Sequence, residues 1–209
     1  MAAQTKQQLI DAAARAFAEQ GVYAASLVEI TRQAEQRNRG AVHYHFGGRD
    51  GLLVAVLQEH AGFLAQREGE LLALARQRPP TDVASVVEAI VRPAVELAET
   101  GERGRAYLAV VGELVETDQD ALSTEVAAAL QQTGGYEVYA VLAERLPPMD
   151  DALLNERFAL VTAFILGTVA RRARAGAGPG GRRQLSADRF VANLVQMAAA
   201  MLTAPTIDE

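Results

Sequence analysis

The chain of 209 residues contains no cysteine and no tryptophan, and only 5% of its residues are aromatic. Without cysteine, a disulfide framework, a thiolate metal site and a thiol nucleophile are all excluded. The chain is half apolar and buries mainly Ala, Leu and Val, a composition that favours helices. Its length is sufficient for one large domain, or for a small domain joined to a larger one.

Long apolar runs are also missing. The N-terminus has no apolar segment behind a basic start, and no stretch reaches the roughly 18 to 20 apolar residues that span a bilayer. We therefore expect no membrane association and a cytoplasmic location, which the absence of cysteine fits. No segment alternates polar and apolar residues with a period of two, so we expect an all-α protein.

The formal net charge of −6 argues at first against a nucleic-acid ligand. The charge is unevenly distributed, however, because residues 1–50 carry six basic and five acidic side chains, whereas the remainder carries 14 basic and 21 acidic ones. Four of the six positive residues fall within 18 positions: Arg32, Arg37, Arg39 and Arg49. Phosphates respond to this local field rather than to the charge of the whole molecule. Ordinary surface charge is the alternative explanation.

The stretch from Asn38 to Phe46 combines a helix-capping residue, a positive residue, two small residues and a His-Tyr-His-Phe ending. We interpret it as a short helix that lies in the major groove of DNA. Asn38 can cap its first turn. Arg39, at its start, can offer two donors to guanine, a contact worth about 1–3 kcal/mol of base discrimination. Val42 and Phe46, four residues apart, can be buried on one face.

Two helices are predicted before this stretch. Residues 5–20 carry apolar side chains at helical spacing, and Gly21 ends the pattern. Ser26 and Glu29 have the spacing of a capping box that opens a second helix, Leu27 to about Ala34. A longer helix followed by two short ones around a tight turn makes a helix-turn-helix domain.

These motifs resemble the DNA-binding domain of the TetR (tetracycline-repressor-like) family of bacterial transcription regulators. The resemblance implies an N-terminal three-helix helix-turn-helix DNA-binding domain, residues 1–50, and a C-terminal helical ligand-binding and dimerisation domain, residues 51–209. One departure is the longer turn, where Glu35 replaces the usual glycine of the left-handed position. The matching elements are Phe17-x-x-x-Gly21, Ser26 to Ile30, Tyr44-His45-Phe46, Gly48-Arg49-Asp50 and Leu52-Leu53.

The residues expected at the DNA lie in and around these motifs. Tyr44, His45 and Arg49 suit phosphate contacts, which position a protein without reading sequence, although Tyr44 and His45 are alternatively local packing residues. His43 and His45 diverge on a helix and have no acidic neighbour, so we expect no metal there. The expected set is Ser26, Arg37, Asn38, Arg39, Gly40, Ala41, His43, Tyr44, His45 and Arg49.

Two later segments, Phe158 to Ala170 and Val191 to Leu202, contain no charged residue. A helix that is apolar nearly all round must be covered on more than one side, either within one core or by a second copy in a twofold four-helix interface. The resemblance favours a homodimer, because members of the family dimerise through their last two long helices. The linker between the segments, Ala175 to Gly181, is rich in glycine and expected to be mobile. The predicted interface residues are Phe158, Val161, Ile165, Phe190, Leu194, Met197 and Met201.

The resemblance also implies a small-molecule effector site in the C-terminal domain. Residues with the size or polarity to line it, each of which is alternatively a core residue, are His60, Phe63, Tyr107, Val111, Tyr136, Tyr139 and Phe164.

The predicted function is that of a ligand-responsive regulator, a repressor that binds palindromic double-stranded operator DNA as a homodimer. The alternative is a dimeric DNA-binding regulator that has no small-molecule effector and answers to a protein partner or acts constitutively. Nothing indicates an enzyme, because there is no phosphate loop and no Ser-His-Asp spacing, and all three histidines lie within the first 60 residues. We expect no cofactor.

Overall fold

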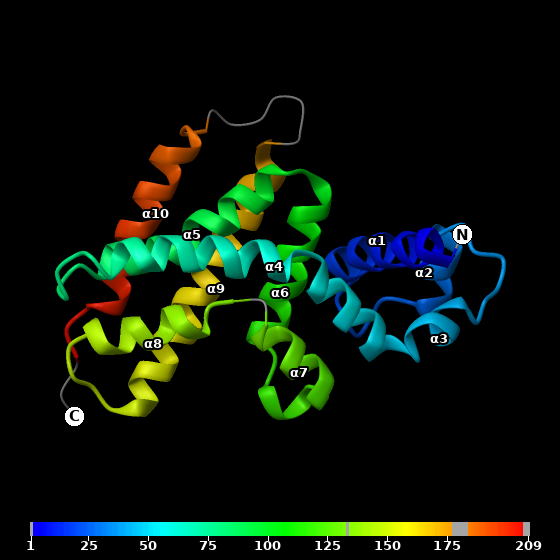
Figure 1. Ribbon diagram of the computed structural model, residues 1–209, viewed down its shortest axis with the longest axis horizontal. Helices are drawn as coiled ribbons and strands as arrows, with labels where there is room; N and C mark the ends of the chain where they lie inside the picture. Colours follow the sequence, from blue (N-terminus) through cyan, green and yellow to red (C-terminus); the bar gives the residue numbers. More distant parts are fainter. Residues whose placement is uncertain (1, 133, 177–183, 207–209) are drawn as a thin grey trace. The chain divides into compact units, whose positions relative to one another are not determined.

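The computed structural model describes residues 2–132, 134–176 and 184–206. Residues 177–181 of the linker predicted to be mobile lie outside this part of the chain. The described residues form no strand, which confirms the all-α prediction. Their helices, in chain order, are α1 (Ala2–Gln20), α2 (Leu27–Gln33), α3 (Ala41–Phe46), α4 (Arg49–Ala75), α5 (Val83–Glu99), α6 (Glu102–Glu116), the 3-10 turn η1 (Gln119–Ala121), α7 (Thr124–Gln131), α8 (Tyr136–Arg145), α9 (Asp151–Gly176) and α10 (Ala187–Leu202) (Figure 1).

By packing, the helices fall into two compact units. One unit contains the described residues up to Gly62 together with residues 100–132, and the other contains residues 63–99 and the described residues from Gly134 onward. The helix α4 therefore contributes its first half to one unit and its second half to the other. The predicted domain boundary after Asp50 divides the chain by expected function and not by packing. It stays a prediction.

In the first unit, α1 packs against α2 and α6 through its apolar face. Leu9, Ala13 and Phe17 on this face are fully buried, and burying a side chain such as Leu or Phe contributes about 1.5–3 kcal/mol. Ion pairs also orient α1, because Arg103 of α6 pairs with Asp11 of α1 at 2.5 Å and with Glu59 of α4 at 3.1 Å. The helix that precedes α2 and α3 is thus fixed to two others.

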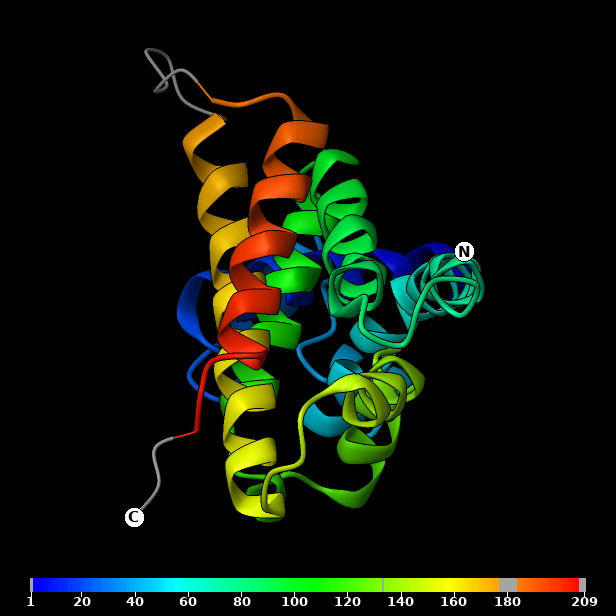
Figure 2. The ribbon, with the colours of Figure 1, turned by 90° about the vertical axis from the view of Figure 1, so that its left-hand side faces the viewer.

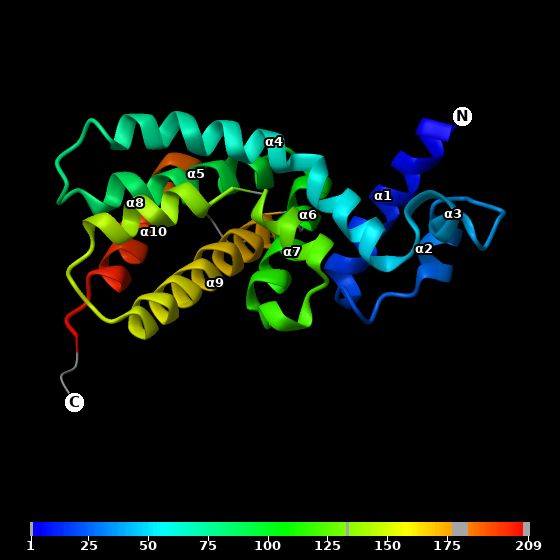
Figure 3. The same ribbon diagram turned by 60° about the horizontal axis from the view of Figure 1, so that its bottom comes forward.

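In the second unit, α5 is the central helix and contacts α8, α9 and α10 (Figure 3). Its buried residues include Val86, Val87, Val91 and Val95. Around it, Arg145 of α8 donates hydrogen bonds to the carbonyl oxygens of Ala75 at 2.7 Å and Asp82 at 2.8 Å. This arginine therefore ties α8 to the end of α4 and to the residue before α5.

Two successive glycines, Gly134-Gly135, lie between α7 and α8. Both have positive φ, +103° and +88°, a conformation that costs other residues energy. The helices α7 and α8 are therefore separate.

The helices α9 and α10 lie antiparallel, side by side (Figure 2). Their bounds extend beyond the two uncharged segments seen in the sequence. By length and composition alone, Asp151–Ala173 is apolar enough to cross a membrane, because an 18-residue window within it has a mean hydropathy of 1.4, although the sequence gives no expectation of a span. This is weak evidence for a membrane span, because a helix inside a protein meets the same criterion. On α9, Leu160 is 56% exposed and Phe158 and Phe164 are half-buried, so part of its apolar surface stays accessible in the single chain.

Candidate nucleic-acid interface

The helix α2 begins at the capping residue that the sequence predicts. The hydroxyl of Ser26 accepts a hydrogen bond from the backbone N–H of Glu29 at 3.4 Å, and Ser26 itself is exposed. The reciprocal half of the predicted capping box does not form, because the Glu29 carboxylate pairs with Arg32 at 2.5 Å instead. The hydrogen bonds from Arg32 also lower the pKa of Glu29. One of the four clustered arginines is therefore already paired within α2.

At the end of α2, Glu35 occupies the left-handed position where the family usually has glycine. Its φ of +56° is the only positive value at a non-glycine residue in the described part of the chain. The N–H of Glu35 donates to the carbonyl of Arg32 at 3.0 Å and that of Gln36 to the carbonyl of Thr31 at 3.1 Å. These two bonds form a Schellman motif, whose left-handed position glycine usually occupies. Here the motif forms with glutamate at an energetic cost.

The third helix is shorter than predicted. It covers Ala41–Phe46, with Gly40 as its N-cap residue, whereas the sequence analysis placed its start at Asn38. Asn38 still acts as a turn former, because its side-chain oxygen accepts a hydrogen bond from the N–H of Gly40 at 2.9 Å. Arg39 therefore lies in the turn ahead of the helix rather than in its first turn.

Exposed polar side chains lie in α3 and in the turn before it. Arg37, Arg39 and His43 are exposed, and Tyr44 is 80% exposed. Within the described residues neither Arg37 nor Arg39 has a hydrogen-bond or ion-pair partner. The opposite face holds the helix in place, since Val42 is 1% exposed. Two guanidinium groups, an imidazole and a phenol thus point away from the core, in reach of a ligand with acceptor groups.

Two members of the predicted DNA-contact set are placed differently by the structure. Ala41 is 4% exposed, so its side chain contributes to the core and not to the exposed surface. Arg49 donates to the carbonyl oxygens of Val22 at 2.5 Å and Ala25 at 2.7 Å, and so it braces the loop before α2 rather than presenting a free fork to phosphate. The sequence could not separate these roles, because an arginine bridging two carbonyls has the same spacing as one facing solvent.

The histidine pair behaves as expected for a helix. His45 is half-buried, and its ring packs edge-on against Tyr44 with centroids 4.9 Å apart, while His43 contacts the carbonyl of Gly47 through Nδ1 at 3.3 Å. No group of three or more potential metal-ligating residues occurs among the residues that the structure describes.

Comparison with known proteins supports what the geometry indicates. Residues 9–56 match the sequence family described as bacterial regulatory proteins, tetR family. Residues 88–201, more than half of the chain, match the family described as tetracyclin repressor-like, C-terminal domain. The chain belongs to the TetR family.

Several curated TetR-like proteins are similar in part. The HTH-type transcriptional regulator AcrR of Shigella flexneri is 31% identical over 110 residues, which are 53% of this chain and 49% of that protein. The HTH-type transcriptional regulator SrpR of Pseudomonas putida is 48% identical over 56 residues, 27% of this chain and 26% of that protein. The matched segment thus spans half or less of each relative's length.

Solved TetR-like structures share the fold across nearly the whole chain. HlyIIR, a hemolysin II transcriptional regulator, aligns with a TM-score of 0.56 at 16% identity, covering 98% of this chain and 100% of that one. AibR, solved in complex with isovaleryl coenzyme A and operator DNA, aligns with a TM-score of 0.55 at 14% identity, covering 97% of this chain and 100% of that one. At such identities the likeness concerns the fold alone.

The residues predicted for an effector site in this TetR-family chain are divided between the two packing units. In the first unit, the His60 ring packs edge-on against Tyr107 with centroids 5.0 Å apart. The Tyr107 hydroxyl donates to the carbonyl of Leu57 at 3.1 Å, and Val111 is 7% exposed. Burial lowers the pKa of His60, an effect that nearby Glu59 partly opposes. His60 and Tyr107 also line a small cavity of about 20 Å³, which holds roughly one water molecule, and Val111 does not line it.

In the second unit, Tyr136 is 62% exposed and Phe63 is 41% exposed. Tyr139 differs from them, because its ring packs against Phe158 with centroids 4.9 Å apart and its hydroxyl is hydrogen-bonded to Thr162 of α9. Phe164 is half-buried on α9. Of the seven predicted residues, Tyr139 is the one that lies in a polar and aromatic cluster.

The predicted dimer interface needs correction. Val161, Ile165 and Leu194 are 1%, 0% and 1% exposed, so they form the core of a single chain and are unable to face a partner. Met197 is 47% exposed, and Phe158, Phe190 and Met201 are half-buried. Leu160, 56% exposed on α9, was missed. The sequence could not show which face of each helix is buried within the chain, because neither face carries a charge in the segments Phe158 to Ala170 and Val191 to Leu202.

Sequence reasoning also missed Glu68, whose half-buried carboxylate accepts a hydrogen bond from the N–H of Gly135 at 2.7 Å. A signal was present, because Glu68 occurs four residues after Leu64 and four before Leu72, both buried. An acidic residue in the apolar stripe of a helix is a candidate functional residue.

Proposed function

We propose that this TetR-family regulator is a homodimeric repressor that binds a palindromic operator and releases it when a small molecule binds. The observation that carries the proposal is the exposed surface around α3. There, Arg37 and Arg39 have no partner among the described residues, and His43 and Tyr44 accompany them. Groups that the protein leaves unpaired at the start of a helix in a helix-turn-helix unit are those available to bases and phosphates.

Within this surface the side chains have different proposed roles. Arg39 offers two parallel donors to guanine O6 and N7. Arg37, Tyr44 and His45 contact phosphates and fix the register of the helix in the groove. Ser26, at the start of α2, takes a further phosphate through its hydroxyl and the neighbouring N–H groups. Asn38 and Gly40 shape the turn that carries Arg39.

Dimerisation is supported by the uncovered apolar side of α9. On α9, Leu160 is 56% exposed and Phe158 and Phe164 are half-buried, and covering such apolar side chains is favourable in water. A second copy of the chain provides such a cover and places two recognition helices on one duplex. Twofold symmetry then demands a palindromic site whose halves are about 34 Å apart or somewhat more.

Release by an effector requires two states that differ in operator affinity. A ligand that binds the weakly DNA-binding state better lowers operator affinity by the difference in its own binding free energy for the two states. AibR was solved with both isovaleryl coenzyme A and operator DNA, so one protein of this fold holds a small molecule and an operator. An alternative in which the second unit serves only dimerisation or a protein partner predicts no ligand response. The reducing cytoplasm, where bacterial DNA is found, is the proposed location.

A gel-shift assay tests DNA binding directly, with the DNA upstream of the protein's own gene and of its neighbours as the probe. The wild-type chain should retain one fragment at low salt, and Arg39→Ala should weaken that complex by roughly 5- to 150-fold, the equivalent of about 1–3 kcal/mol. The matched control is Arg78→Ala, which removes an exposed arginine from the other unit and should leave the affinity unchanged. Equal binding by Arg39→Ala and wild type would remove Arg39 from the interface.

A thermal-shift screen tests for the effector. A ligand present at 100 times its dissociation constant adds about 2.7 kcal/mol to stability, enough for a clear rise in Tm. If ligands that raise Tm also release the operator, the effector hypothesis is supported. A screen in which such ligands leave the operator complex intact favours the alternative without an effector.

A further inference from the structure

The loop between α1 and α2 determines where the helix-turn-helix motif begins, and packing fixes only part of it. Within this loop, residues 21–25, Val22 and Ala25 are fully buried. Tyr23 is 50% exposed, and Ala24 is exposed as well. Buried backbone groups in such a loop need hydrogen-bond partners, and those of Val22 have theirs outside it.

Both backbone groups of Val22 are bound by side chains that are distant in the sequence. Its N–H donates to Oε1 of Glu113, in α6, at 2.8 Å. Its carbonyl oxygen accepts a hydrogen bond from Arg49, in α4, at 2.5 Å, and the same guanidinium donates to the carbonyl of Ala25 at 2.7 Å. Two other helices therefore hold the loop, one from each side of Val22.

The chain passes close to Glu113 at Gly21 as well. The N–H of Gly21 donates to the carbonyl of Phe17 at 2.9 Å, and its φ of +92° lies in the region that favours glycine. A Cβ added at Gly21 would lie 3.4 Å from Oε1 of Glu113. The carboxylate thus lies directly against the point where the chain leaves α1.

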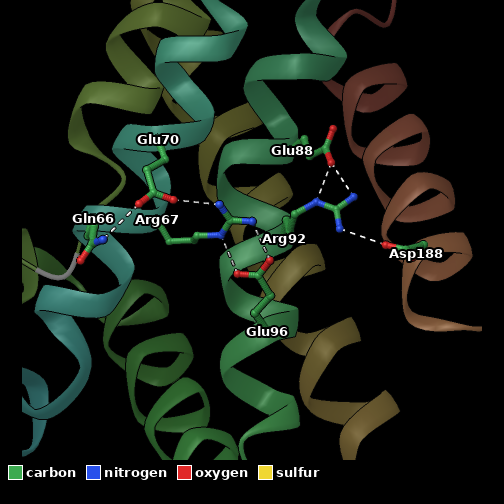
Figure 4. Close-up of polar contacts among 7 residues, drawn as sticks. All are labelled: Gln66, Arg67, Glu70, Glu88, Arg92, Glu96 and Asp188. Atoms are coloured by element: carbon green, nitrogen blue, oxygen red, sulfur yellow. Dashed lines mark hydrogen bonds and ion pairs between the residues drawn. The ribbon is translucent and has the colours of Figure 1, made fainter.

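Glu113 differs from the acids of the second unit in what it binds. Arg67 of α4 donates to Glu96 of α5 at 2.8 and 3.0 Å, as Figure 4 shows. In the same view Arg92 of α5 pairs with Asp188 of α10 at 3.1 Å. Among the residues that the structure describes, no basic side chain pairs with Glu113. Its carboxylate is used on a backbone N–H, in a charge-assisted hydrogen bond that is stronger than a neutral one.

The helix that carries Glu113 is itself fixed in place. Arg103, ten residues earlier on α6, pairs with Asp11 of α1 at 2.5 Å and with Glu59 of α4 at 3.1 Å. At 1.5 Å per residue, the two attachments are about 15 Å apart along α6. One of them holds α1 and the other holds the loop that follows α1, so α6 sets the position of the loop relative to α1.

The far end of α2 has a separate attachment to α1. The side chain of Gln36, in the turn before α3, donates to the side chain of Gln8 of α1 at 3.1 Å. The seven residues of α2 are therefore positioned at the start through Val22 and at the end through Gln36. Since α3 follows this turn, the orientation of its exposed side chains depends on both attachments.

We propose that Glu113 is a positioning residue for operator binding, which acts through the N–H of Val22 to hold α2 and α3 in the orientation that fits the major groove. The inference rests on the proposed function. It assigns one determinant of DNA binding to α6, outside the matched residues 9–56. Without an acceptor at position 113 the loop takes further conformations, and the apparent operator affinity falls by the fraction of molecules in the fitting one. Non-specific attraction to phosphates depends on charge and not on this orientation.

Two variants with the same charge and nearly the same length separate the acceptor from the charge. Glu113→Gln keeps an oxygen that accepts from Val22, whereas Glu113→Met offers only a weakly accepting sulfur. Gel-shift titrations use the operator fragment that the wild type retains and a shuffled fragment of the same length and composition. Glu113→Gln should bind the operator within twofold of the wild type, and Glu113→Met roughly tenfold more weakly, the size of one lost hydrogen bond to a charged group. Both variants should bind the shuffled fragment equally.

The matched control is Glu116→Met, at an exposed acid three residues further along α6, which should bind the operator as the wild type does. Glu113→Asp keeps the charge but is one methylene too short to reach the N–H. It should also lose operator affinity, which gives the same test if Glu113→Met does not fold. Equal operator affinity of Glu113→Gln with these shorter or non-accepting variants would overturn the proposal, as would an equal loss on the shuffled fragment.

Hydrogen exchange of the Val22 amide in the protein without DNA tests the same contact independently. The amide should exchange at least tenfold faster in Glu113→Met than in Glu113→Gln, while the amides of α6 exchange at the same rate in both. Equal exchange of the Val22 amide in the two variants would contradict the proposal. If the wild type binds no operator, the proposed function fails, whereas the exchange rates still report whether Glu113 holds the loop.

Discussion

At the residue scale, Glu35 holds a left-handed backbone conformation, with a φ of +56°, which costs a residue with a side chain more than it costs glycine. Arg49 was assigned to phosphate, but it donates to two carbonyl oxygens of its own unit. A backbone conformation follows from local sequence, whereas the direction of an arginine side chain depends on residues distant in the chain.

Replacing Glu35 by glycine tests the strain. Glu35→Gly should raise the free energy of unfolding by about 0.5–1 kcal/mol, since the left-handed conformation costs a non-glycine residue about 1–2 kcal/mol and glycine loses more entropy on folding. Urea unfolding measures the change. Gln33→Gly, inside α2, is the control and should lower stability by about 1 kcal/mol. Loss of stability in both variants would show that the turn holds glutamate without strain.

The raised pKa of Glu68 makes a prediction about stability and pH. Burial raises its folded pKa to about 7, above the ordinary 4.5, so between these values the folded chain binds the proton that the unfolded chain has lost. Stability therefore falls as pH rises from about 4.5 through 7, and the loss is complete above that range. Because Glu68 is partly exposed, we expect a loss of about 1–2 kcal/mol.

Glu68→Gln removes this titration. The free energy of unfolding of the variant minus that of the wild type should be about 1–2 kcal/mol larger at pH 8 than at pH 5. Urea unfolding of the wild type and the variant at pH 5 and pH 8 isolates the contribution of Glu68, since every other titratable group is present in both proteins. A stability difference between the two proteins that does not vary with pH would mean that Glu68 keeps an ordinary pKa.

At the scale of elements, helix existence follows from sequence and helix faces do not. The cap at Ser26 was predicted from local signals and is present. In the uncharged segments of α9 and α10, Phe158 to Ala170 and Val191 to Leu202, the absence of charge conceals which side faces the chain's own core, so Val161 and Ile165 were assigned to the wrong side. Polar residues on one side of these helices would have given the missing signal.

The uncovered side of α9 should govern the assembly state. Leu160 is 56% exposed, and Leu160→Glu would place a charge in the proposed dimer interface, where desolvation is costly. Sedimentation analysis should show the wild type at twice the chain mass and the variant shifted toward the chain mass. Leu74→Glu, at a similarly exposed leucine of α4, should stay dimeric. A monomeric wild type, or a Leu160→Glu variant that dimerises equally well, would contradict this interface.

At the scale of the whole molecule, the sequence predicts the family and the fold class but not how the chain is divided by packing. Residues 100–132 belong to the same compact unit as the described residues up to Gly62, which contain the helix-turn-helix motif. Nearly 40 residues of the chain lie between these two parts of the unit. Long-range packing of this kind leaves no local signal. The function of a TetR-family regulator nevertheless depends on one requirement, that the surface around α3 meets DNA twice per assembly.

Hydroxyl-radical footprinting of the wild-type protein on its bound fragment tests that requirement most directly. Two protected blocks should be related by a twofold axis, their centres separated by about one helical turn of roughly 10 base pairs or somewhat more. Arg39→Ala should lose protection in both blocks at protein concentrations where Arg78→Ala retains it. A single protected block, or protection unaffected by Arg39→Ala, would contradict the account.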